Sequence, residues 1–94
     1  MPTFHLAHIK EQGVELIIIL LAQRFQRKTE ADRSAIISEL QRRATAAGLA
    51  GWVVPVWNSG GGQIGFIAPR LWRPFFQNIS LSYIYQRLNR TLSW

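Results

Sequence analysis

The side chains that could perform acid–base or metal chemistry are few and poorly placed for it. His5 and His8 lie three residues apart in a segment that alternates like a strand, and a period of two places them on opposite faces. A tetrahedral metal site needs three or four converging ligands, and adding Glu11 or Glu15 to one histidine supplies too few. The sequence therefore predicts no metal site. A histidine working with Glu15 is the minor enzymatic alternative.

The remaining acids, serines and glycines form no catalytic or cofactor-binding pattern. Glu30 and Asp32 stand where a helix is expected to begin, and negative charge is stabilising at a helix N-terminus. No serine lies in a nucleophile elbow, and neither histidine has serine and aspartate partners in a familiar order. The glycines at 60–62 lead from one expected strand into another, whereas phosphate-binding loops lead into a helix. We therefore expect neither catalysis nor a cofactor.

Arginine beside aromatic side chains is the combination best suited to binding a partner. The 94 residues include 11 Lys and Arg against five Asp and Glu, for a net charge of +6, and every acid lies within the first 39 residues. Arginine forms paired hydrogen bonds with carboxylate or phosphate and stacks on rings, so this excess favours acidic partners. Some rings, such as Phe75 or Phe76, must fill the core. The predicted partner-binding residues are Arg70, Trp72, Arg73, Tyr83, Arg87 and Arg90.

A second cationic cluster precedes the first expected helix. It joins three cations and one ring to the free backbone N–H groups of the first helical turn, an arrangement that can bind an anion. Glu30 and Asp32 partly neutralise this charge, so a solvated loop is the alternative interpretation. The residues of this secondary anion-binding cluster are Arg24, Phe25, Arg27 and Lys28.

Alternating and continuous apolar segments predict the strands that position these groups. Residues 3–9 alternate and residues 14–22 are apolar on both faces, so the first reads as a half-buried strand and the second as a central one. The short polar connection between them predicts an antiparallel hairpin. A second hairpin is expected from 52–57 and 63–68, and Pro55 places its first strand at an edge or at a bulge.

Two helices are predicted from capping residues and apolar spacing. Thr29 can cap a helix that begins near Glu30, and Gly48 supplies a left-handed stop. Ser80 can cap a last helix, preceded by a loop or a single turn at 70–76. In that helix one apolar stripe is opposed by Tyr83, Arg87, Arg90 and, if the helix persists, Trp94. The stripe contains Leu81, Ile84, Tyr85, Leu88 and Leu92.

These elements predict a single α+β domain over residues 1–94. We expect a four-stranded, mainly antiparallel sheet in the order ββαββα, with helices packed on one face. The absence of cysteine excludes disulfides and suits a reducing compartment. The longest apolar run falls well short of the roughly 20 residues that span a bilayer, so we expect no membrane span and a cytoplasmic location.

Residues 48–76 carry a resemblance to a protein family. The segments GLAGWVVPVW, GGGQIGFIAP and WRPFF resemble small uncharacterised proteins of cyanobacteria. The resemblance implies a bacterial cytoplasm and carries no activity or site residues with it.

Charge and composition together favour a binding function. We expect a non-catalytic interaction module, a small regulatory protein that binds an acidic or mixed protein surface through its C-terminal arginines and rings. The alternative is binding of RNA or single-stranded DNA, in which rings stack on bases and arginines follow the phosphates. Free strand edges would also allow pairing of two copies into a homodimer.

Overall fold

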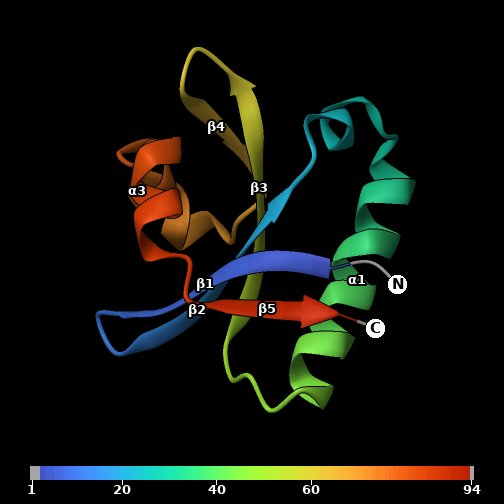
Figure 1. Ribbon diagram of the computed structural model, residues 1–94. Helices are drawn as coiled ribbons and strands as arrows, with labels where there is room; N and C mark the ends of the chain where they lie inside the picture. The colour runs from blue at the N-terminus through green and yellow to red at the C-terminus, as the bar shows by residue number, and fades with distance from the viewer. Residues whose placement is uncertain (1–2, 94) are drawn as a thin grey trace.

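A computed structural model describes residues 3–93 as a mixed sheet with helices on both faces (Figure 1). The strands are β1 (Thr3–Glu11), β2 (Val14–Leu21), β3 (Trp52–Gly60), β4 (Gln63–Phe66) and β5 (Arg90–Ser93). The α-helices are α1 (Glu30–Ala46), α2 (Arg73–Gln77) and α3 (Leu81–Arg87), and two 3₁₀ turns, η1 (Gln23–Arg27) and η2 (Arg70–Trp72), precede α1 and α2. The class is therefore α+β, as expected.

The sheet has five strands in the order β4-β3-β2-β1-β5. Strand β2 runs parallel to β3, and the other neighbouring pairs are antiparallel. The sequence expectation that β2 is central is confirmed, and its residues 16–19 are 0% exposed. The parallel pair is possible because α1 lies between its strands and supplies the long connection that parallel strands require.

Helix α1 covers one face of the sheet, here called the α1 face (Figure 1). Thr29 caps its first turn by accepting a hydrogen bond from the Asp32 backbone N–H at 3.1 Å, as predicted. Gly48 follows the helix with φ +82°, a left-handed conformation that glycine adopts without strain. The buried core residues of this face are Leu6, Ile17, Ile19, Leu21, Phe25, Leu40, Ala44, Val53, Trp57 and Leu92.

Helices α2 and α3 cover the opposite face, here called the α2/α3 face (Figure 1). Phe76 and Ile84 from the two helices are completely buried there. They pack against strand residues Ala7, Leu16, Ile18, Val54 and Val56. The expectation that all helices pack on one face is therefore wrong. The physical reason lies in β2, whose apolar side chains point alternately to both faces, so both faces must be covered.

The predicted last helix ends early and is followed by a fifth strand. Helix α3 stops at Arg87, Leu88 is extended, and β5 pairs with β1. Leu92, expected on a helical stripe with Ile84, lies opposite Phe4 and is buried on the other side of the sheet. Tyr85, expected on the same stripe, is 55% exposed. Trp94, expected on the polar side of this helix, lies outside the described residues.

Pro55 occupies an internal strand rather than an edge strand, and this corrects the first part of the expectation. Strand β3 pairs with β2 throughout residues 52–57, whereas its ladder with β4 begins at Val56. The outer edge of β3 at Pro55 thus needs no N–H for β4, which is why proline fits. The irregularity in β3 lies between Asn58 and Gly60.

Candidate functional site

The predicted partner-binding residues divide between the two faces of the sheet. Arg70 and Trp72 lie on η2, Arg73 begins α2, and Tyr83 and Arg87 lie on α3, so five of the six come from the elements on the α2/α3 face. Arg90 begins β5 directly opposite Leu6. Since cross-strand neighbours share a face and Leu6 belongs to the α1 core, Arg90 is separated from the other five.

The rings of this group belong partly to the packing. Trp72 and Tyr83 are half-buried and pack against the α2/α3 core. Phe75 links them, with ring centroids 5.8 Å from Trp72 and 6.2 Å from Tyr83, both nearly edge to face. Arg87 lies over the Tyr83 ring, with its Cζ 4.0 Å from the centroid. The rings are therefore largely engaged within the molecule, and the cations remain outside.

Leu71 is the residue of this surface that the sequence interpretation missed. It lies in the middle of η2 between exposed Arg70 and half-buried Trp72, and its side chain is 91% exposed. The signal in the sequence was an apolar residue placed between arginines just after Pro69, where no periodic element could bury it. An apolar side chain thus projects from the middle of the cationic segment.

The acids lie mostly on the other side of the sheet from these arginines. Glu30, Asp32 and Glu39 belong to α1, and Glu15 shares its face with Ile17 of the α1 core. Only Glu11, at the end of β1, occupies a strand position that alternates onto the α2/α3 face, as Ala7 does. Within residues 3–93, Arg70, Arg73 and Arg87 have no carboxylate within ion-pair distance. The charge asymmetry of the sequence is therefore also an asymmetry in space.

Glu39 forms ion pairs with two arginines of its own helix, Arg42 and Arg43. Its carboxylate accepts hydrogen bonds from Arg42 and from the Arg43 Nε at 2.9 Å. The hydrogen bond from Arg42, followed by that from Arg43, lowers the pKa of Glu39 below its ordinary value. This carboxylate is therefore engaged within α1 itself.

The secondary cationic cluster is also divided by the fold. Phe25 is only 3% exposed and packs 5.1 Å from the Trp57 ring, so its ring belongs to the α1 core rather than to the open surface. The 3₁₀ turn η1 directs this single aromatic side chain into the α1 core. Arg27 lines a polar hollow with Gln23, Gln26 and Ser59. Arg24 and Lys28 instead reach a different, apolar pocket, although Arg24 borders the polar hollow as well.

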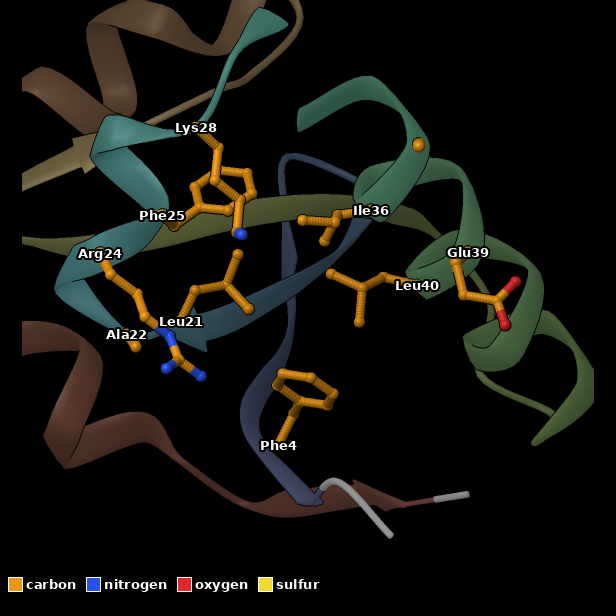
Figure 2. Close-up of a pocket in the computed structure, with 10 residues that line it drawn as sticks. Phe4, Leu21, Ala22, Arg24, Phe25, Lys28, Ile36, Glu39 and Leu40 are labelled. Carbon is orange, nitrogen blue, oxygen red and sulfur yellow. The ribbon is translucent and has the colours of Figure 1, made fainter. Parts of the chain in front are cut away.

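That apolar pocket lies between η1, the first half of α1 and the α1 face of the sheet (Figure 2). Its volume is about 400 Å³. The walls are mainly apolar, and the polar side chains at its margin are Arg24, Lys28 and Glu39. The apolar lining residues are Phe4, Leu21, Ala22, Phe25, Ala35, Ile36 and Leu40.

The His8 ring lies among groups of neighbouring segments on the α1 side. The His8 Nε2 atom lies 2.9 Å from the Ala50 carbonyl oxygen and 3.8 Å from a Glu15 carboxylate oxygen. Among residues 3–93 no group of three or more histidine, cysteine or acidic side chains could hold a metal ion.

Among the same residues, no helix has the length and apolar character needed to cross a bilayer.

Comparisons with models of protein families, with curated proteins and with solved structures gave no match. The functional conclusion therefore depends on the geometry of the site.

Proposed function

We propose that the protein is a non-catalytic interaction module that binds an acidic protein surface through η2 and the start of α2. The observation that carries the proposal is Leu71, 91% exposed and flanked by Arg70 and Arg73. The two arginines are exposed and, within the described chain, have no carboxylate partner. Binding of an acidic partner here would bury the exposed apolar side chain away from water and would place acidic groups beside the two cations.

The engagement of the rings favours a protein over a nucleic acid. Binding of single strands depends on ring faces that are free to stack with bases. Here Arg87 lies over the face of Tyr83, and Trp72 meets Phe75 edge to face. Arginine side chains whose neighbouring rings Trp72 and Tyr83 are engaged suit carboxylates on a protein surface, because one guanidinium can donate a pair of hydrogen bonds to one carboxylate.

Site-specific photo-crosslinking in the cells that make the protein tests this proposal. Leu71 is replaced by p-benzoylphenylalanine, and Ser34, an exposed residue of α1, is replaced in the same way as the matched control. We expect a crosslinked product at position 71 that protease removes and nuclease leaves intact, with no such product at position 34.

The outcomes separate the two classes of partner. A product at position 71 that nuclease destroys would overturn the proposal in favour of RNA or single-stranded DNA. Identical products at both positions, or none at position 71, would also overturn it. Introducing Arg73→Glu into the crosslinking chain is expected to abolish the product, because it reverses one of the two charges that flank Leu71.

A further inference from the structure

We propose that the pocket between η1, α1 and the sheet binds one molecule of a free fatty acid, with its carboxylate at Lys28 and Arg24 and its alkyl chain among the apolar walls. This site is independent of the surface around Leu71, because it lies on the α1 face of the sheet. Its volume of about 400 Å³ falls within the range of small-molecule sites, about 300 to 1,000 Å³.

The walls of the pocket fit an unbranched apolar chain. Ile36 and Leu40 approach from α1, Leu21 from the end of β2, and Phe4 from the start of β1 (Figure 2). Ala22 and Ala35 are small and exposed, and they leave room between the larger side chains. A hydrocarbon chain placed here would lose contact with water along its length, which is the main driving force for binding of an apolar group.

The margin of the pocket selects an anionic head. The Lys28 side chain points toward the space between η1 and α1, and Arg24 extends from η1 on the same side (Figure 2). Within residues 3–93 neither cation has an ion-pair partner. Among the described lining residues the acid is Glu39, which already accepts hydrogen bonds from Arg42 and Arg43. The charge left for a ligand is therefore positive.

The concave shape points to a free molecule rather than to a lipid held in a bilayer. Leu21, Phe25 and Leu40 line the pocket yet are buried, so the apolar surface is recessed behind the helix and the 3₁₀ turn. Binding to a bilayer instead requires apolar groups that protrude into the interface. A single chain that enters the recess can reach these groups, whereas the surface of a membrane cannot.

Calorimetric titration with decanoate, below its micelle concentration, tests the proposal. We expect one decanoate to bind per chain and decyltrimethylammonium, which has the opposite charge, to show no binding. Lys28→Gln should weaken decanoate binding by about tenfold, as expected for loss of a charge-assisted contact. Arg27→Gln removes the same charge from a residue that does not line this pocket and should change the affinity by less than about twofold.

Two variants test the place of the alkyl chain. Ala35→Trp and Ala22→Trp fill the pocket from α1 and from the start of η1, at exposed positions. Each should abolish decanoate binding while the circular dichroism spectrum stays that of the parent protein. Failure of decanoate to bind the parent chain would overturn the proposal. So would equal effects of the two glutamine variants, or unchanged binding in a folded tryptophan variant. Binding of phosphatidylglycerol vesicles without binding of decanoate would overturn it in favour of a membrane surface.

Discussion

At the scale of single residues, the contact between Gly65 and Trp57 shows how closely the α1 core is packed. The two residues pair across β3 and β4, and a Cβ atom built on Gly65 would lie 2.3 Å from the indole ring. Trp57 is 5% exposed and packs against Phe25, so the ring cannot move aside without disturbing its neighbours. The absence of a side chain at position 65 therefore lets the indole lie on the strand.

We predict that Gly65→Ala lowers the free energy of unfolding by about 1–3 kcal/mol, the usual effect of overpacking a core. Urea denaturation measures it. In a Trp57→Leu background the same glycine substitution should have a much smaller effect, because the atoms that clash are gone. Equal losses in the two backgrounds would contradict the packing described here.

Glu39 gives the prediction for pH dependence. Its pKa is lowered in the folded protein by the hydrogen bond from Arg42 and then by that from Arg43. A lowered pKa means that the folded state favours the carboxylate, so this contribution is complete above the ordinary value of 4.5 and is lost as the pH falls through the folded value. Glu39→Gln should therefore lower the melting temperature slightly near pH 7, and this deficit should shrink as the pH falls below 4.5. A deficit that persists in acid would show that the glutamine acts by another route.

Single residues also mark what the sequence could and could not predict of the site. The arginines were identified from type and spacing, because charged side chains stay at the surface. The burial of Phe25 could not be predicted, because one aromatic residue in a short polar segment has no periodicity to reveal its direction, and the turn of η1 decides it. Leu71 was missed for the converse reason, since apolar residues are expected inside and only the structure shows this one exposed.

At the scale of elements, capping explains why α1 begins where it does. The Thr29 hydroxyl oxygen accepts from the Asp32 N–H, so Thr29→Ala should lower the free energy of unfolding by about 1 kcal/mol. Thr45→Ala, at an exposed position inside the same helix, is the matched control and should be nearly neutral or slightly stabilising. Equal losses in chemical denaturation would refute the role of Thr29.

The C-terminal residues allow a test that distinguishes strand β5 from a helix continuing past Leu88. A helix continuing past Leu88 would place Tyr85 and Leu92 on one buried stripe, whereas the structure exposes Tyr85 and buries Leu92 in β5. Leu92→Ala should therefore lower the free energy of unfolding by about 2–3 kcal/mol, and Tyr85→Ala by less than about 0.5 kcal/mol. Comparable losses for the two variants in urea denaturation would favour the continuous helix.

The end of α3 was hard to predict because a separation of four residues, as from Leu88 to Leu92, places two side chains on one face of a helix and equally on one face of a strand. Contacts with β1 decide between the helix and the strand. The side-chain Nδ2 of Asn89 donates to the His8 backbone carbonyl, and the side-chain Oδ1 of Asn89 accepts from the His8 backbone N–H at 2.9 Å. These contacts join the last segment to the edge of β1, and no local pattern in the sequence announces them.

At the scale of the whole molecule, the hydrophobic pattern of β2 determines the three-layer arrangement. Two apolar faces on one central strand require cover on both sides, and the sequence showed this pattern clearly. The order of the first hairpin, the helix and the second hairpin was predictable for the same reason. The layer to which each helix belongs was not, because it follows from the parallel pairing of β2 with β3, which places α1 on one face and leaves the other to α2 and α3.

This arrangement also converts a charge gradient along the chain into two unlike surfaces. Glu39 of α1 pairs within its own helix, whereas the arginines of η2, α2 and α3 lie on the opposite side of the sheet, where Leu71 is exposed. Position on the sheet, rather than net charge, should therefore control binding. Arg73 and Arg90 provide a matched pair, because both are exposed and they belong to different faces.

The most direct test is the affinity of the protein captured at position 71 for the parent chain and for Arg73→Glu and Arg90→Glu, measured by calorimetry. Both variants change the net charge equally. We predict that Arg73→Glu weakens binding by at least about tenfold, while Arg90→Glu changes it by less than about twofold. Equal losses in the two variants would contradict the account, because they would show that total charge, and not the surface around Leu71, governs binding.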